Sequence, residues 1–161
     1  MSPSVATIDQ ELADCLAKIV GERRVLFRPS ELLTYSSDGL PSYHKQPGLA
    51  VFPGTRDEVV AVVRELARRK VSFVPRGAGT GLSGGALADG VVLIGLNRLS
   101  RVLSIDAENG LAVVEPGVVN VALSRAVAAY GLHYAPDPSS QAACTIGGNV
   151  AENAGGPHCL K

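Results

Sequence analysis

The sequence lacks an excess of charge, because its fifteen lysine and arginine residues balance fifteen aspartate and glutamate residues. A neutral chain has no field that draws it to a phosphate backbone, so nucleic acid is not an expected partner. Cysteines are few: Cys15, Cys144 and Cys159 form no CxxC pair, and an odd count argues against a disulfide framework or a zinc site. We therefore expect a reducing, cytoplasmic location and no bound metal.

Long apolar runs are also missing. No stretch approaches the roughly 18 apolar residues that cross a bilayer, and the N-terminus lacks the basic-then-apolar order of a secretion signal. The sequence therefore predicts a soluble protein without a membrane span. Its 161 residues, 46% of them hydrophobic, suffice for one sizeable core.

Glycine, in contrast, is abundant. The chain holds eighteen glycines, more than the usual share of about 7%, and nine of them crowd into two short stretches. We call residues 75–85 (PRGAGTGLSGG) the first glycine loop. Residues 136–156 (PDPSSQAACTIGGNVAENAGG) are the second glycine loop.

Two helices are expected in the first half of the chain. Apolar residues recur at helical spacing from Ile8 to Ile19, after a capping-box pattern of Thr7 with Gln10. The second helix begins at another capping box, Thr55 with Glu58. Its predicted buried stripe consists of Val59, Val63 and Leu66.

The strands expected around this second helix are residues 49–52, 71–74 and 91–94, which are short apolar runs rich in β-branched side chains. The order strand, helix, strand is that of a βαβ unit, and fully apolar strands suit a sheet covered on both faces. We therefore expect a parallel three-stranded sheet, with the first glycine loop at the carboxyl end of one strand.

From about Val102 the pattern changes. Residues 102–105 and 111–114 are expected to form a hairpin, because Asn109-Gly110 signals a tight reversal between them. A helix over residues 121–130 follows, with Asn120 as its cap and Gly131 as its left-handed terminator. A second subdomain, with an antiparallel sheet, is therefore predicted.

The first glycine loop is typical of an anion cradle, because glycines let backbone N–H groups approach one bound phosphate; a flexible surface loop is the alternative. Residues 79–84 match G-x-G-x-x-G, but only residues 86–90 precede the next strand, too few for the crossover helix of a dinucleotide fold. A Walker A loop is excluded because Gly85 and Ala86 stand where Lys and Ser or Thr are needed.

The second glycine loop carries short polar side chains. Asn149 and Asn153 share one face if residues 149–154 form a helical turn, and their amides, with Thr145, would then bond a ligand edge. Each of these residues alone is equally well explained as a cap or turn former.

Together these motifs resemble those of the vanillyl-alcohol-oxidase-type FAD-linked oxidases, which carry a PCMH-type FAD-binding domain. The chain is most similar to the branch that holds the glycolate oxidase FAD subunit and D-lactate dehydrogenase. The resemblance extends from Tyr35 to Lys161 and rests on the first glycine loop, on Glu115-Pro116-Gly117, and on residues 144–149 and 153–156.

The resemblance implies FAD as the cofactor, with the pyrophosphate in the first glycine loop and the adenosine half near Pro116. The second glycine loop would line the flavin and the ribityl chain. The implied cofactor-binding residues are Arg76, Gly77, Ala78, Gly79, Thr80, Gly81, Leu82, Gly84, Pro116, Gly117, Pro138, Ser139, Thr145, Gly147, Gly148, Asn149, Asn153 and Gly155. Some relatives attach FAD through a histidine near the position of Thr80, so non-covalent binding is expected here.

The implied fold is α/β (α+β): a small parallel sheet flanked by helices, followed by the start of an antiparallel subdomain. Residues 1–47 would be a helical lead-in, and residues 48–161 a truncated PCMH-type domain whose remainder and cap domain are absent. The implied function is oxidation of a small 2-hydroxy acid, such as glycolate or D-lactate, with possible electron-transfer partner subunits. The alternative is an FAD-binding module without turnover of its own, and the fragment itself is expected to be inactive.

No catalytic residue is assigned from the sequence. His44, His133 and His158 have no carboxylate at a spacing that suggests a dyad, and no serine lies in a nucleophile motif. His158 follows the second glycine loop, so a direct role at the flavin is the alternative to a surface position. The base for the hydroxyl proton is expected beyond Lys161.

Overall fold

The computed structural model describes residues 8–159. Its main sheet has the strand order β1-β2-β4-β3, formed by β1 (Val25–Leu26), β2 (Leu49–Val51), β4 (Val92–Gly95) and β3 (Phe73–Arg76). Strands β2, β4 and β3 run parallel, and the short β1 joins β2 antiparallel. The predicted parallel three-stranded sheet is confirmed, whereas β1 is too short to leave a pattern in the sequence.

Both faces of this sheet are covered. Leu49, Val51 and Val92 belong to one core cluster with residues of α1 (Gln10–Val20) and α3 (Arg56–Arg68). Ala50 and Leu93 point to the opposite face, where α2 (Pro29–Leu32) contributes to a second cluster. Burial on both faces explains why these strands are apolar without alternation. Short 3₁₀ turns, η1 (Glu22–Arg24) and η2 (Leu33–Tyr35), connect these elements.

Helix α1 begins later than its sequence pattern suggested. Its cap is Asp9, whose side chain accepts a hydrogen bond of 2.9 Å from the Leu12 N–H. Gln10 is the first helical residue and donates to Asp14 instead of completing a capping box. Thr7, the expected cap, lies outside the described residues. The buried face of α1 therefore starts at Leu12.

The predicted cap of α3 is confirmed, because the Thr55 hydroxyl accepts from the Glu58 N–H. The predicted buried stripe is wrong in part: Val62 and Leu66 are fully buried, while Val59 and Val63 are only half-buried. Helix α3 packs against α1 as well as against the sheet, so its buried arc is rotated from the stripe that the spacing suggested.

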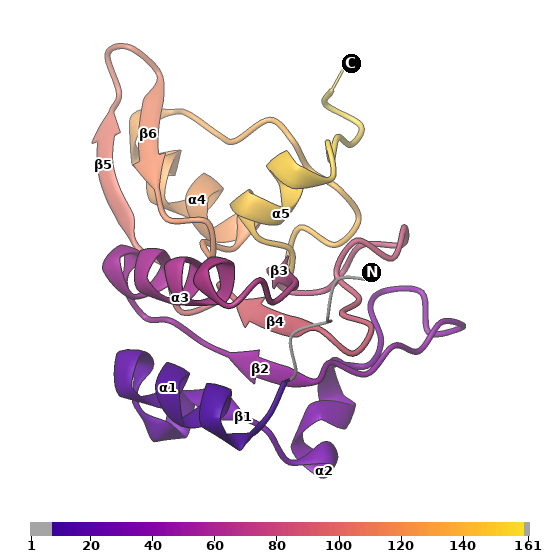
Figure 1. Ribbon diagram of the computed structural model, residues 1–161. Helices are drawn as coiled ribbons and strands as arrows, with labels where there is room; N and C mark the ends of the chain where they lie inside the picture. Colours follow the sequence, from indigo (N-terminus) through magenta and orange to yellow (C-terminus); the bar gives the residue numbers. More distant parts are fainter. Residues whose placement is uncertain (1–7, 160–161) are drawn as a thin grey trace.

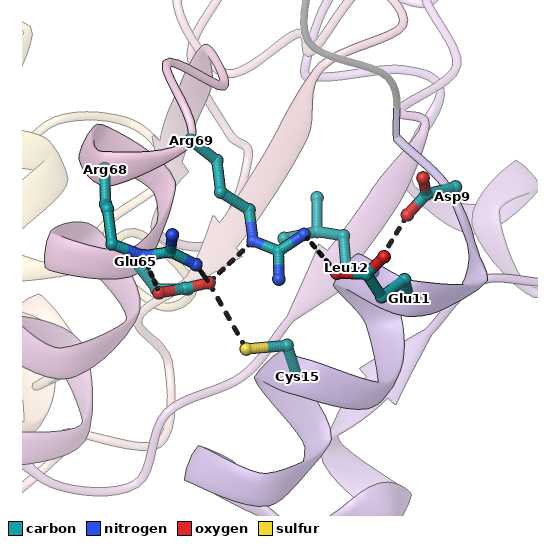
Figure 2. Close-up of polar contacts among 7 residues, drawn as sticks. All are labelled: Asp9, Glu11, Leu12, Cys15, Glu65, Arg68 and Arg69. Carbon is teal, nitrogen blue, oxygen red and sulfur yellow. Dashed lines mark hydrogen bonds and ion pairs between the residues drawn. The ribbon is translucent and has the colours of Figure 1, made fainter.

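A polar network joins α3 to α1 (Figure 2). Glu65 accepts hydrogen bonds from Arg68 at 2.6 Å, from Arg69 at 2.6 Å and from the Cys15 thiol at 3.3 Å. Arg69 also reaches Glu11 on α1, at 3.0 Å. The bonds from Arg68 and Arg69 lower the pKa of Glu65 to about 2.

Strand β3 begins at Phe73, two residues later than expected. Helix α3 ends in a left-handed turn at Lys70, with φ of +55°, and the Val71 N–H bonds back to the Leu66 carbonyl at 2.9 Å. Val71 therefore fills the core below the helix end and does not enter the sheet.

The second sheet is the predicted hairpin of β5 (Val102–Asp106) and β6 (Leu111–Val114), seen at the upper left of Figure 1. Its turn is closed by Asp106, which accepts from the Asn109 N–H, and by Gly110 at φ of +65°. Side chains on its inner face pack on α4 (Asn120–Val127).

The cap predicted for α4 is wrong. Asn120 is the first helical residue and is buried, and its amide donates to the Pro136 carbonyl at 2.7 Å. The predicted terminator is confirmed, because Gly131 has φ of +70° after the 3₁₀ turn η3 (Ala128–Tyr130). The last element is α5 (Ile146–Ala151). Among the described residues, no helix is both long and apolar enough to span a membrane.

Candidate functional site

The first glycine loop leaves the sheet at the carboxyl end of β3, the edge at which ligands gather in α/β sheets. No helix begins between Gly79 and Gly85, as the sequence predicted. Residues 38 and 39 hold the loop in place through hydrogen bonds. Asp38 accepts from the Gly84 N–H at 3.1 Å, and the Gly39 N–H donates to the Gly81 carbonyl at 3.0 Å.

Arg76 supports the loop from below. Its guanidinium is nearly buried and donates to the carbonyls of Ser37 at 2.8 Å and Ala86 at 3.3 Å. Burial lowers the pKa of Arg76, although the charge of Asp38 opposes the shift. Gly79 lies directly on this guanidinium with φ of +70°, so a β-carbon there would overlap it. Arg76 thus sets the shape of the loop through backbone carbonyls.

The first glycine loop is rich in backbone N–H groups without a partner. Within residues 8–159, no backbone N–H group from 77 to 83 donates a hydrogen bond to the protein. Unpaired N–H groups are costly unless water or a ligand takes them, and a row of them forms an anion-binding concavity. The anion cradle stays a prediction, and the unpaired N–H groups are the observation that supports it.

The second glycine loop lies across from the first. Gly147 donates to the Pro116 carbonyl at 2.8 Å, and a β-carbon on Gly147 would lie 2.6 Å from the Pro116 side chain. The Thr145 hydroxyl lies directly against Gly77, where a β-carbon would overlap it. Both positions need glycine, because neighbouring atoms lie too close to leave room for a β-carbon.

The two loops enclose a cleft of about 440 Å³. Most of the residues implied for cofactor binding line it: Arg76, Gly77, Ala78, Gly79, Thr80, Gly81, Leu82, Pro116, Pro138, Ser139, Thr145, Gly147, Gly148 and Asn149. Tertiary structure thus brings together three segments that are far apart in the sequence.

Four implied residues do not line this cleft. Gly117 is buried, and a β-carbon there would lie 2.5 Å from the Leu96 carbonyl oxygen. Gly84 turns toward Asp38, and Gly155 lies beside Cys159.

Asn153 is the fourth. Helix α5 spans Ile146–Ala151, so the helical turn expected over residues 149–154 is wrong in its bounds. Asn153 follows the helix in a left-handed conformation, with φ of +51°, and is exposed. It therefore does not share a helix face with Asn149.

Two polar atoms at the cleft are buried without a partner, the Thr145 hydroxyl oxygen and the Asn149 amide nitrogen, and each residue is 4% exposed. Burial raises the pKa of the nearby Tyr134. Buried polar atoms normally have partners, and each orphan costs about 1–3 kcal/mol. A ligand in the cleft would supply the missing partners.

Glu152 is a cleft residue that sequence reasoning missed. It follows Asn149 by three positions, so it lies on the same side of α5, and this spacing was a usable signal. Cys144 also lines the cleft and is buried.

The spacing of the histidines suggested no carboxylate partner for any of them, and for His158 the structure corrects this. His158 does have a carboxylate partner, because its Nδ1 lies 2.5 Å from Asp137 and its backbone N–H also contacts that carboxylate. Burial raises the pKa of Asp137, but the bonds from His158 outweigh it and lower the value. The pair is 21 residues apart, so spacing did not reveal it. His158 is exposed and does not line the cleft. Among the described residues, no cluster of three metal-ligating side chains occurs.

Comparisons with known proteins agree with this geometry. The family model described as "FAD binding domain" matches residues 47–161. The glycolate oxidase subunit GlcD of Escherichia coli (strain K12) is 51% identical over 139 residues, which cover 85% of this chain and 28% of that protein. A D-lactate dehydrogenase of Anaerostipes hadrus is 36% identical over 146 residues, which cover 89% of this chain and 30% of that protein.

A solved structure shares the fold. The crystal structure of p-cresol methylhydroxylase with substrate bound superimposes with a TM-score of 0.79 at 21% identity, covering 93% of this chain and 31% of that one. At this identity the likeness shows the fold alone, and it confirms the predicted fold class. The chain spans between 28% and 31% of the length of these three proteins.

Proposed function

The chain belongs to the FAD binding domain family, and on this premise we propose that it is the flavin-holding part of an oxidoreductase acting on a small 2-hydroxy acid. FAD is the cofactor of the domain. The relatives named glycolate oxidase subunit and D-lactate dehydrogenase support a substrate of the glycolate or D-lactate type. When bound, FAD supplies the acceptor for the substrate hydride.

The residues of the cleft fit this cofactor. The observation that carries the proposal is the row of unpaired N–H groups over residues 77–83, beside a cleft that Thr145 and Asn149, with their unpaired polar atoms, also line. A diphosphate takes up many N–H donors at once without a cationic side chain. The glycine contacts between the loops keep the backbone close enough to surround such a group.

We place the diphosphate on the first glycine loop, from Gly77 to Leu82, and the adenosine half beside Pro116. Thr145, Gly148 and Asn149 would then face the flavin and ribityl side, where the orphaned hydroxyl and amide gain partners. Arg76 contributes indirectly, because its guanidinium is occupied by protein carbonyls. Attachment is non-covalent in this proposal, since Thr80 has no imidazole to add to the flavin.

The proposal extends to organisation and partners. The FAD-binding unit begins near residue 48, with residues 1–47 as a lead-in whose helix α1 shares the core of the main sheet. The GlcD relative is named a subunit, which supports electron transfer to partner subunits. All three cysteines are free thiols, which supports a reducing, cytoplasmic location.

A binding experiment tests the proposal. The chain is titrated into FAD while flavin fluorescence is followed, with riboflavin as the ligand that lacks the diphosphate. We expect saturable binding of FAD and much weaker binding of riboflavin. Acid precipitation of the complex is expected to leave all flavin in the supernatant, since no covalent bond holds it. Equal affinity for the two flavins would refute the proposed cradle.

Turnover is tested separately by adding glycolate or D-lactate to the complex without oxygen and following the visible absorption of the flavin. Bleaching would show oxidation of the acid. Binding of FAD without bleaching is the result expected if this part of the protein is inactive by itself, and it fits the alternative, an FAD-binding module without turnover of its own, equally well.

A further inference from the structure

Two carboxylates flank the first glycine loop, and they differ in how they are held. Asp38 accepts from the N–H groups of Leu40 at 2.9 Å and Gly84 at 3.1 Å, so its position is fixed by the backbone. The Glu152 carboxylate has no hydrogen bond and no ion-pair partner among the described residues. Asp38 is therefore part of the loop's framework, whereas Glu152 is free to move.

Glu152 extends from the end of α5 onto the loop. Its backbone N–H bonds to the Gly148 carbonyl at 3.0 Å, which anchors the residue at the helix end. Its Oε1 atom lies 2.5 Å from the position that a β-carbon on Gly85 would take. Its carboxyl carbon lies 3.9 Å from the corresponding position on Gly81. The negative charge therefore lies beside Gly81, within the stretch of unpaired N–H groups, and beside Gly85 at the end of the loop.

We propose that Glu152 is an internal anion that competes with the cofactor's diphosphate for the first glycine loop, and so limits how tightly FAD is held. The inference rests on the proposed function, because it takes the loop as the diphosphate site. In the absence of FAD the carboxylate lies in the field of the free N–H groups. The diphosphate displaces it, and the exposed side chain swings into solvent.

The physical reason is charge repulsion over a short distance. A diphosphate that uses the N–H groups of residues 77–83 brings its charges within a few ångströms of Glu152, where unit charges interact by about 1 kcal/mol even in water-like surroundings. No described cation pairs with Glu152 to cancel its charge. Salt screens such an interaction, so its effect is largest at low ionic strength.

The test compares the wild-type chain with Glu152→Gln, which keeps the shape of the side chain and removes the charge. Dissociation constants are measured for FAD, ADP and riboflavin at low and at high salt. We expect FAD and ADP to bind about three- to tenfold more tightly to the variant at low salt, with the gain shrinking at high salt. Riboflavin, which lacks the diphosphate, is expected to bind unchanged.

Glu108→Gln is the matched control, because it removes one negative charge from an exposed residue in the β5–β6 turn. Its affinities for FAD and ADP should equal those of the wild type. Glu152→Ala provides a second variant, and thermal unfolding confirms that each protein is folded.

Three outcomes overturn the inference. Unchanged affinity of Glu152→Gln for FAD and ADP would show that the carboxylate does not compete with the diphosphate. Weaker binding would show that Glu152 accepts a hydrogen bond from the cofactor, an attractive role opposite to the one proposed. If neither wild type nor variant binds FAD, the proposed function fails, and the inference fails with it.

Discussion

The polar groups of the α1–α3 interface have hydrogen-bond partners within the protein, whereas those of the cleft between the glycine loops do not. At the interface, Glu65 accepts from Arg68, Arg69 and Cys15, and Arg69 also pairs with Glu11 (Figure 2). At the cleft, the N–H groups of residues 77–83 and the buried side-chain atoms of Thr145 and Asn149 have no partner in the protein.

This difference separates stability from binding. Groups at the interface satisfy one another, so their loss should change unfolding and leave ligand affinity alone. The polar groups at the cleft are held in place by the fold but have no hydrogen-bond partners in it. The free energy that this costs is recovered when a ligand forms the missing hydrogen bonds. Variants of the two regions should therefore change different measured quantities.

The largest effect is expected for Gly79→Ala. Alanine disfavours φ of +70°, and its β-carbon would overlap the Arg76 guanidinium, so the loop must shift and its N–H groups turn away from a common point. We expect FAD to bind on the order of a hundredfold more weakly, or about 2.7 kcal/mol. Equilibrium dialysis with FAD measures the change.

Gly110→Ala is the matched control for this prediction. Gly110 has a similar φ of +65° in the hairpin turn, but a β-carbon there meets nothing within 4 Å. Because of its positive φ the control should lose about 1 kcal/mol of stability, and it should keep its FAD affinity. Equal loss of FAD affinity in both variants would mean that strain alone, and not the loop geometry, explains the effect.

A smaller effect is expected for Thr145→Val, which should keep or raise the stability of the protein without FAD but lower its affinity for FAD. The hydroxyl is buried and unpaired, so valine removes an unsatisfied polar atom while keeping the shape of the side chain. Unfolding in urea should show unchanged or increased stability without FAD. FAD should bind about tenfold more weakly, because one hydrogen bond is lost. A variant that loses stability and keeps its FAD affinity would reverse the assignment of this residue to the cleft.

The smallest effect concerns Glu65 and acid pH. Its pKa lies at about 2 in the folded protein, below its ordinary value of 4.5, because Arg68 and Arg69 bond to the carboxylate. The stability that it contributes is therefore complete above pH 4.5 and is lost as the pH falls from about 4.5 to about 2. Unfolding in urea across this range should show a smaller decline for Glu65→Gln than for the wild type.

FAD affinity near neutral pH should be the same in Glu65→Gln and in the wild type, because the network lies on α1 and α3, away from the cleft. Glu108→Gln again serves as the control and should follow the wild-type decline. A clear change of FAD affinity in Glu65→Gln would contradict the separation of the two regions.

By itself, the sequence determined the features that depend on near neighbours. The parallel strands, the Thr55 cap, the hairpin turn at Gly110 and the terminator Gly131 were all predicted, because apolar spacing and glycine chemistry act over a few residues. The glycines of the first loop also predicted an anion cradle, whereas FAD was implied by the resemblance of the motifs in both loops to those of FAD-linked oxidases. The later start of β3 shows the limit of such local patterns. Val71 was assigned to the strand because it is apolar, but it packs in the core below the end of α3.

Only the tertiary structure decided which groups meet. It placed Thr145 against Gly77, committed Arg76 to the carbonyls of residues 35–37, and brought Glu152 over the first glycine loop. It also buried Asn120 as a donor to Pro136 instead of a cap. These contacts join residues far apart in the chain, and their partners follow from how helices and sheets pack. Local spacing carries no information about that packing, because a side chain's neighbours across a core depend on every element that covers it.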